Sequence, residues 1–116
     1  MAVKIAICQL SSCWGCQESL LDLYEKLIPI LPSLDIRYWS TVVDTKKQNL
    51  EETPKAGLDV SLVEGMFRTE DDVELLKLAR EKSKLLVAYG MCSSYGGIPG
   101  LANMFERDDL LRRKFI

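Results

Sequence analysis

The chain has 116 residues, of which 47% are hydrophobic and 28% are charged. The length leaves room for one domain and excludes two, and the composition predicts a soluble globular protein rather than a disordered or membrane-embedded one. The 15 basic residues nearly offset the 17 acidic ones, for a net charge of -2, and the two signs are mixed along the chain. No basic run is long enough to follow a nucleic acid or an anionic membrane, so we expect neither partner.

The N-terminus has none of the features of a secretory signal, and no apolar run approaches the ~20 residues of a membrane span. We therefore expect a cytoplasmic protein. In a reducing compartment, the four cysteines are more often metal ligands, redox groups or buried apolar residues than disulfides. Histidine is absent from the sequence, which excludes histidine-based nucleophiles, HExxH zinc sites and a histidine general base.

Residue patterns in the first half of the chain predict two strands and a helix. The nearly unbroken apolar run at residues 3–10 is typical of a strand that is buried on both faces. Residues 17–28 have apolar side chains at helical spacing, and two prolines close that predicted helix. A second strand is predicted at residues 36–43, and a polar loop at residues 44–55.

The second half of the chain continues the alternation. A third strand is predicted at residues 58–63, and Thr69 caps a helix with acidic residues in its first turn and basic residues near its end. A fourth strand at residues 85–89 runs into the glycine-rich loop Gly90–Pro99. This alternation favours an α/β fold with a mainly parallel sheet and helices on both faces.

Three unusual segments follow strands of this predicted sheet. They are Cys13–Cys16 after the first strand, Glu64 and Gly65 after the third, and Gly90–Pro99 after the fourth. Ligands of such folds bind outside the carboxyl ends of the strands. We therefore expect these segments to converge at one edge of the sheet.

Cys13 and Cys16 are separated by two residues in a loop that opens a helix, so both can present thiolates to one metal centre. The same spacing describes a thioredoxin-like dithiol, which forms and breaks a disulfide. Spacing alone leaves these two interpretations nearly even, with a zinc site third. Cys92 shifts the balance toward a cluster, because it lies at the same predicted edge, where Gly96 and Gly97 let the backbone approach a bulky group. The alternative for Cys92 is a small apolar residue in a tight turn.

Other candidate residues have simpler expected roles. Cys8 lies within the apolar strand and is expected to pack in the core. Glu18 is favoured in the first helical turn by the helix dipole, whatever the function is. For Glu64 we favour a hydrogen-bond acceptor that ties loops together over a proton carrier. Trp14 shields a cluster from water or fills a pocket of a partner, and Trp39 is expected to be a core residue.

The combined motifs resemble a known family. The motifs are Cys13-x-x-Cys16-x-Glu18-Ser19, Glu64-Gly65 and Gly90-x-Cys92-x-x-x-Gly96-Gly97-Ile98-Pro99. Together they resemble the small subunit of nickel-iron hydrogenases, in particular the cytoplasmic F420-non-reducing (methyl-viologen-reducing) type. The resemblance covers nearly the whole chain.

The resemblance implies a flavodoxin-like domain that holds the proximal 4Fe-4S cluster through Cys13, Cys16 and Cys92. In the family a fourth ligand lies beyond the third, whereas no cysteine follows Cys92 in this sequence. Because the chain stops at Ile116 inside a predicted amphipathic helix, we expect it to be the N-terminal portion of a longer small subunit. The alternatives are a ligand from elsewhere or an incomplete cluster.

The resemblance also suggests which residues surround the cluster. Glu18 and Glu64 would lie next to the ligands or on a proton path. The backbone of the cluster loops would be supplied by Gly15, Gly90, Gly96, Gly97 and Pro99.

In that family the nickel-iron centre resides in the large subunit, so the resemblance implies a large-subunit partner and no hydrogen-splitting activity in this chain alone. The loops that carry the cysteines would form part of a large interface. Electrons would pass one at a time to the cluster, and then to a ferredoxin or a heterodisulfide reductase complex. Complex I subunits of the 20 kDa type are the alternative family, but they usually have adjacent cysteines where this chain has Cys13-x-x-Cys16. A small dithiol oxidoreductase and a zinc-stabilised interaction module are the alternatives from other classes.

Overall fold

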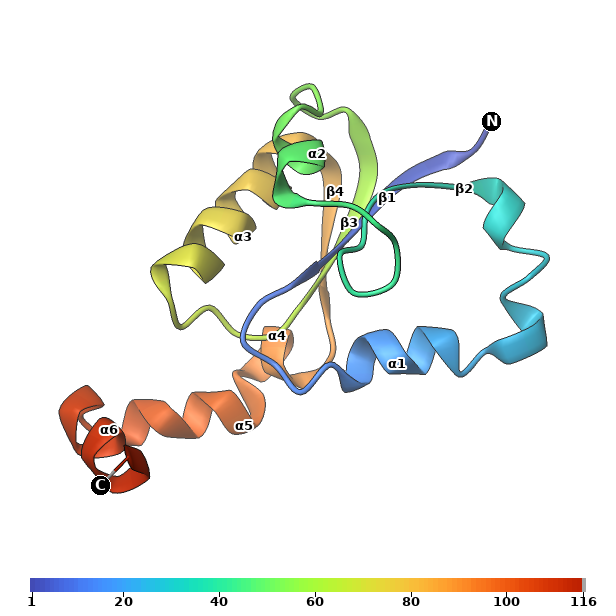
Figure 1. Cartoon of the computed structure of the whole chain (residues 1–116). Helices are drawn as coiled ribbons and strands as arrows, with labels where there is room; N and C mark the ends of the chain where they lie inside the picture. The colour runs from blue at the N-terminus through green and yellow to red at the C-terminus, as the bar shows by residue number, and fades with distance from the viewer. Residues whose placement is uncertain (116) are drawn as a thin grey trace.

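The computed structural model describes residues 1–115 and shows a four-stranded sheet with helices on both faces (Figure 1). Every pair of neighbouring strands is parallel, and the strand order is β2-β1-β3-β4. This is the order in which flavodoxin-like sheets begin. The predicted α/β fold is therefore confirmed. The strands are β1 (Val3–Gln9), β2 (Leu34–Tyr38), β3 (Leu58–Glu64) and β4 (Ser83–Tyr89).

Short helices connect and follow the strands. The α-helices are α1 (Gly15–Leu21), α2 (Lys47–Glu51), α3 (Glu70–Lys82), α4 (Met91–Tyr95), α5 (Gly97–Gly100) and α6 (Arg107–Phe115). Three further turns of 3-10 helix are η1 (Tyr24–Lys26), η2 (Leu31–Ser33) and η3 (Leu101–Met104).

Strand β1 lies inside the sheet and buries side chains on both faces, as its apolar sequence predicts. Ala6 and Cys8 face the core beneath α2 and α3, while Ile5 and Ile7 face the opposite core beside Trp39. Cys8 is completely buried, and this burial raises the pKa of its thiol to about 12. The expected packing role of Cys8 is thus confirmed.

Helix α3 begins where its capping residues predict. The Thr69 hydroxyl accepts a hydrogen bond from the Asp72 N–H at 3.1 Å, and Asp72 accepts one from the Thr69 N–H at 3.0 Å. Ala79 on the inner side of this helix is completely buried. This reciprocal cap fixes the path of the chain from β3 into α3.

The first helix is shorter than its apolar spacing predicts. Instead of running from residue 17 to residue 28, α1 ends at Leu21 and is followed by the separate turns η1 and η2. Tyr24 has a φ of 46° and is 74% exposed, and Ile28 is also exposed. An amphipathic helix gains most of its stability by packing its apolar face, and this segment lacks that packing.

Two predicted loops contain short helices, and one predicted strand is shortened. Helix α2 lies within residues 44–55, where Leu50 is completely buried, and α4 and α5 occupy most of Gly90–Pro99. Strand β2 ends at Tyr38 because the chain turns after it: the N–H groups of Val42 and Val43 both donate to the Trp39 carbonyl. The predicted terminal helix corresponds to α6, and Ile116 lies outside the described residues.

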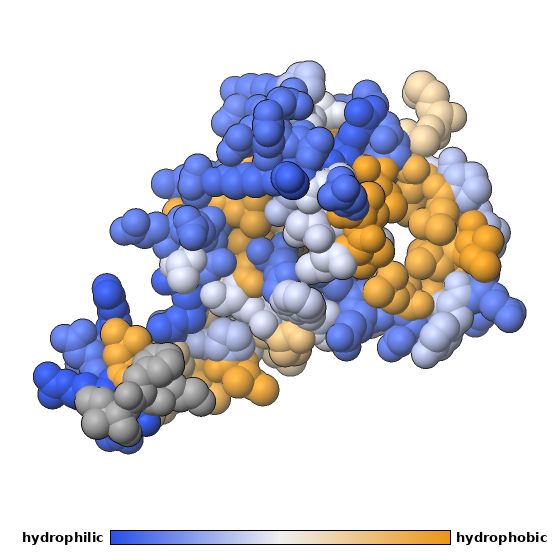
Figure 2. Space-filling view, viewed as in Figure 1, coloured by the Kyte–Doolittle hydropathy of each residue, from blue (hydrophilic) through white to orange (hydrophobic). Residues whose placement is uncertain are grey.

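Helices α5 and α6, with η3 between them, form a C-terminal arm (residues 97–115) that projects from the body of the molecule (Figure 1). The radius of gyration is 15.6 Å, whereas a compact domain of 100 residues has about 13 Å. Figure 2 shows apolar side chains on the surface of the arm and of the segment between α1 and β2. Among residues 1–115, no helix combines the length and the apolar character that crossing a bilayer requires.

Candidate functional site

The three segments that follow β1, β3 and β4 meet at the carboxyl edge of the sheet. Glu64, Cys92 and Cys13 all lie close enough to Cys16 to influence the pKa of its thiol. A Cβ atom placed on Gly90 would overlap the Cys16 sulfur. The predicted convergence is therefore observed in the structure.

The loop from Cys13 to Cys16 is held in a tight turn at the start of α1. Trp14 takes the left-handed conformation with a φ of 70°, and its carbonyl accepts hydrogen bonds from the N–H groups of Gln17 and Glu18. Cys13 is exposed and Cys16 is half-buried, and both are free thiols. A Cβ atom on Gly15 would lie 3.5 Å from the Cys13 sulfur, so this glycine borders the site without being required by it.

Cys92 lies in α4, which is tied to the end of β3. The Ser93 hydroxyl is within hydrogen-bond distance of two carbonyls that flank Glu64, at 2.6 Å from Val63 and 2.9 Å from Gly65. After α4, Gly97 has a φ of 55°, and a Cβ atom there would lie 2.8 Å from the Cys92 sulfur. Both the backbone conformation and the space around Cys92 therefore require glycine.

Glu64 is the buried charge of the site, with 1% of its surface exposed. Its Oε1 atom accepts hydrogen bonds from the Gln17 amide at 2.6 Å and from the Ser12 hydroxyl at 3.2 Å. Its Oε2 atom has no hydrogen-bond partner among the described residues. A buried carboxylate with one free oxygen is costly unless a further group approaches it.

The environment of Cys16 disfavours a bare thiolate. Burial raises the pKa of this thiol, and the neighbouring negative charge of Glu64 raises the pKa further. A positively charged metal group would reverse this preference, because thiolates bind metals in the deprotonated form.

The donor set fits an iron-sulfur cluster in its chemistry. Three cysteine thiols approach one edge, and iron-sulfur clusters are held by cysteine thiolates. Gly90 and Gly97 keep Cβ atoms away from the sulfurs of Cys16 and Cys92. Within residues 1–115, no three acidic or cysteine side chains are close enough to bind a single metal ion. A cluster of several irons is larger than one ion, so its ligands stand further apart.

Other predicted residues lie around this edge in different settings. Glu18 is exposed in the first turn of α1, and the described residues provide no hydrogen bond to its side chain. Trp14 is 50% exposed, and Pro99 lies within α5. Gly96, between α4 and α5, has a φ of 87°, and a Cβ atom added there would lie 3.7 Å from its nearest neighbours, which is an ordinary contact distance.

Sequence reasoning missed several polar residues that hold the site together. Gln17 is 3% exposed and binds Glu64, although a glutamine in a first helical turn normally faces solvent. The Ser19 hydroxyl lies 2.7 Å from the Tyr89 hydroxyl, which links α1 to the end of β4. The cysteine motif places Gln17 and Ser19 beside the site, but no spacing rule distinguishes them from surface residues.

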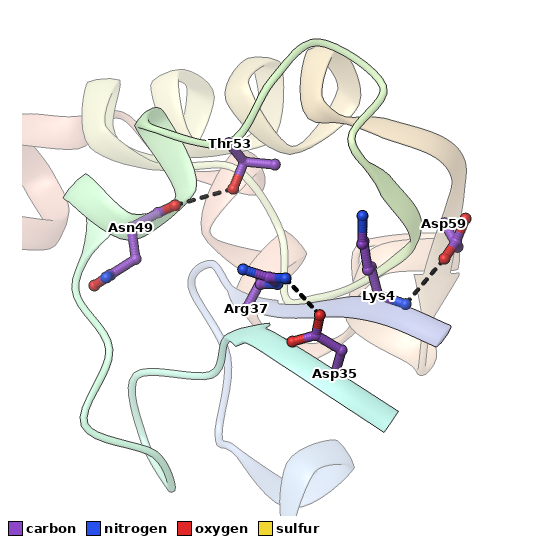
Figure 3. A network of polar contacts seen from close by, with 6 residues as sticks. All are labelled: Lys4, Asp35, Arg37, Asn49, Thr53 and Asp59. Carbon is purple, nitrogen blue, oxygen red and sulfur yellow. Dashed lines mark hydrogen bonds and ion pairs between the residues drawn. The ribbon is translucent and has the colours of Figure 1, made fainter. Parts of the chain in front are cut away.

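A polar cavity of about 490 Å³ lies at the opposite, amino-terminal edge of the sheet. Figure 3 shows Lys4, Asp35, Arg37, Asn49 and Thr53, which are among the residues that line it. Two of its charges are satisfied within the chain, because Arg37 pairs with Asp35 at 2.6 Å. This cavity is separated from the cysteines by the length of the strands.

The match to a family model decides the classification. A model described as NADH ubiquinone oxidoreductase, 20 Kd subunit, matches residues 13–114. The chain belongs to this family. The matched span includes the cysteines at 13, 16 and 92 and the whole parallel sheet after β1.

Curated relatives of the chain carry hydrogenase names. It is 48% identical over 111 residues to a subunit of the vhu F420-non-reducing hydrogenase of Methanocaldococcus jannaschii, a match that covers 96% of this chain and 36% of the relative. It is 40% identical over 117 residues to an iron-sulfur subunit of the F420-non-reducing hydrogenase of Archaeoglobus profundus, covering 100% of this chain and 36% of the relative. The chain thus spans about a third of the length of these relatives.

A solved structure has the same fold. It is described as "Crystal structure of NAD+-reducing [NiFe]-hydrogenase in the H2-reduced state", and the match has a TM-score of 0.84 at 26% sequence identity. The match covers 97% of this chain and 59% of the matched chain. The predicted flavodoxin-like architecture therefore agrees with that of a hydrogenase component.

Proposed function

We propose that this chain is the cluster-holding part of a nickel-iron hydrogenase small subunit, which carries electrons away from a hydrogen-splitting large subunit. One observation carries the proposal. Cys13, Cys16 and Cys92 approach one another at the carboxyl edge of a parallel sheet, in a chain whose relatives are named as hydrogenase subunits.

In this proposal the three cysteines are ligands of a 4Fe-4S cluster, and the fourth ligand comes from outside residues 1–116. The cluster supplies one-electron transfer when it is bound. The chain's own residues shape and hold its environment. Gly90 and Gly97 let the sulfurs of Cys16 and Cys92 lie close against the backbone, and Ser93 fixes α4 against β3.

The proposed partner is a hydrogenase large subunit that contains the nickel-iron centre. Exposed apolar side chains lie on the segments that carry the cysteines, which is typical of a surface that another protein covers. These side chains are Trp14, Met91, Tyr95 and Ile98. A ferredoxin or a heterodisulfide reductase complex would accept the electrons, and we propose that the assembly works in the cytoplasm.

The first prediction tests the cysteine assignment with Cys92→Ala in the full-length protein, produced anaerobically together with its large subunit. We expect loss of the iron, of the visible absorption and of the electron paramagnetic resonance signal of the reduced cluster, because a thiolate ligand is removed. Iron analysis and the two spectra measure this loss.

Cys8→Ala is the matched control, since Cys8 is a completely buried cysteine in the same sheet. This variant should keep the iron and both spectra, while its free energy of unfolding falls by about 1 kcal/mol, as for deletion of one buried methyl group. Unchanged iron and spectra in Cys92→Ala would contradict the proposal. A colourless wild-type protein with stoichiometric zinc would support the zinc module instead.

The family description favours a second candidate, an electron-transfer subunit of an NADH:quinone oxidoreductase. It uses the same cluster chemistry but a different large partner. Co-purification separates the two candidates: the hydrogenase proposal requires a nickel-containing partner, whereas the second candidate requires a partner without nickel.

A further inference from the structure

Gln17 is a buried polar residue next to a proposed cluster ligand. It directly follows Cys16 in α1, and only 3% of its surface is exposed. Burying an amide is costly unless its donor and acceptor groups are satisfied. Its hydrogen-bond partners therefore indicate why the chain places a glutamine here.

Two donors fix the orientation of the Gln17 amide. The Trp39 indole nitrogen donates to Oε1 at 2.6 Å, and the Thr41 hydroxyl donates to the same oxygen. An indole N–H can only donate, so the atom facing Trp39 must be the amide oxygen. The amide nitrogen is consequently directed to the other side.

On that other side, the Gln17 nitrogen donates to Oε1 of Glu64 at 2.6 Å. The carboxylate is almost completely buried, and its second oxygen has no partner among the described residues. Its negative charge lies close enough to Cys16 to act on that thiol. Gln17 therefore joins the turn after β2 to the carboxylate beside Cys16.

We infer that Gln17 is a positioning residue of the cysteine site, whose amide anchors the Glu64 carboxylate to Trp39 and Thr41 and so holds a fixed negative charge beside Cys16. The inference rests on the proposed function, because this charge matters to electron transfer only where a cluster binds. A fixed negative charge beside a cluster opposes the addition of an electron, so it lowers the reduction potential.

The requirement for an amide can be tested by exchanging the two side chains. In the Gln17→Glu variant, two carboxylates would face each other where the amide now donates. In the Gln17→Glu, Glu64→Gln double variant, Glu at position 17 still accepts from Trp39 and Thr41, and Gln at position 64 donates back to it. The double variant restores the hydrogen bond between the two positions in the reverse direction, while the carboxylate moves from position 64 to position 17.

The experiment compares the wild-type protein, the single variant and the double variant, each full-length and purified anaerobically with its large subunit. We expect the single variant to retain about 10-fold less iron than the wild type, as for loss of other residues that orient metal ligands. The double variant should recover the iron of the wild type, and a redox titration followed by electron paramagnetic resonance should show a midpoint potential that differs from that of the wild type.

Equal iron content in the wild type and Gln17→Glu would overturn the inference. A double variant that fails to recover iron would also overturn it, because the shape of the two side chains, rather than their donor and acceptor groups, would then matter. A double variant that recovers iron but keeps the midpoint potential of the wild type would overturn it as well. A wild-type complex without iron would overturn the proposed function instead. In that case thermal unfolding decides whether the anchor exists: the midpoint must fall in the single variant and recover in the double variant.

Discussion

Beside two of the cysteine sulfurs, single glycines decide whether the sulfur can keep its position. Gly90 has a φ of 87°, and a Cβ atom there would overlap the Cys16 sulfur. At Gly97, an added Cβ atom would lie 2.8 Å from the Cys92 sulfur. Each of these positions combines a backbone conformation that favours glycine with contact to a proposed ligand, so substitution should affect both folding and binding.

A prediction at the residue scale is that Gly90→Ala reduces cluster binding by more than backbone strain explains. The variant must move the Cys16 sulfur, and its positive φ also costs about 1 to 3 kcal/mol of folding free energy. Iron content and urea unfolding measure the two effects.

Gly96→Ala is the matched control for this prediction, because Gly96 also has a φ of 87° but an added Cβ there would make only ordinary contacts, at 3.7 Å. It should lose stability while keeping its iron. Equal iron loss in the two variants would show that strain, rather than contact with Cys16, is responsible.

The cysteines were predictable as a group, whereas Gln17 was not. Cys13, Cys16 and Cys92 follow predicted strands of a parallel sheet, and the topology alone brings such segments to one edge. The role of Gln17 depends on the Trp39 indole and on the depth of Glu64. These are properties of tertiary packing that no local pattern in the chain records.

At the scale of secondary-structure elements, Asp72 connects the cap of α3 to the loop after β1. One of its oxygens accepts hydrogen bonds from the N–H groups of Arg68 and Thr69 and from the Ser11 hydroxyl, at 2.8 to 3.0 Å. Burial would raise the pKa of this carboxyl, but the hydrogen bonds outweigh burial, and the pKa of Asp72 is lowered from 3.8.

We predict that Asp72→Asn lowers the free energy of unfolding by about 1 kcal/mol at neutral pH, because charge-assisted hydrogen bonds become neutral. A lowered pKa in the folded state stabilises the fold fully above the ordinary pKa, and this contribution is lost as the pH falls through the folded-state value. The difference in the free energy of unfolding between the wild type and the variant should therefore become smaller in acid. Urea unfolding across this range measures it.

Asp71→Asn is the control, since Asp71 is exposed in the same turn and the described residues give its side chain no hydrogen bond. It should unfold almost like the wild type at every pH. A difference in the free energy of unfolding between Asp72→Asn and the wild type that stays constant across the acid range would contradict this role of the Asp72 carboxylate.

Elements with a long apolar period were predictable, and short ones were not. Helix α3 has 13 residues and a capping box, so both its start and its inner face follow from the sequence. Helix α2 has five residues and a single buried apolar side chain, Leu50, which leaves no period to detect. Helix α1 was predicted too long because Tyr24 and Ile28 have helical spacing but no surface to pack against.

At the scale of the whole molecule, most of the exposed large apolar side chains lie in two regions. One region is the edge that carries the cysteines and the arm that follows it, and the other is the segment between α1 and β2 (Figure 2). The proposed function assigns the first region to the large subunit. Ile98, which is 82% exposed in α5, is a sensitive position in this region.

We predict that Ile98→Asp weakens association with the large subunit about 10-fold or more, because a buried unpaired charge costs at least about 1.4 kcal/mol in the interface. The thermal stability of the separate chain should not fall, since Ile98 is exposed there. Affinity co-purification with titrated large subunit measures the change.

Ile28→Asp is the control from the second region, where Ile28 is 66% exposed. It should bind the large subunit like the wild type. An equal loss of binding in the two variants would place the interface elsewhere or spread it over both regions.

The distance in sequence between Cys16 and Cys92 gives the proposed cluster a second physical effect, that of a cross-link. More than half of the chain lies between these cysteines, and they approach each other only after β1, β3 and β4 have paired. A bond network that closes a loop of this size restricts the unfolded chain, which in the chain-entropy model stabilises the fold by about 4 kcal/mol. Iron loading would thus come late in folding and would then lock the order of the strands.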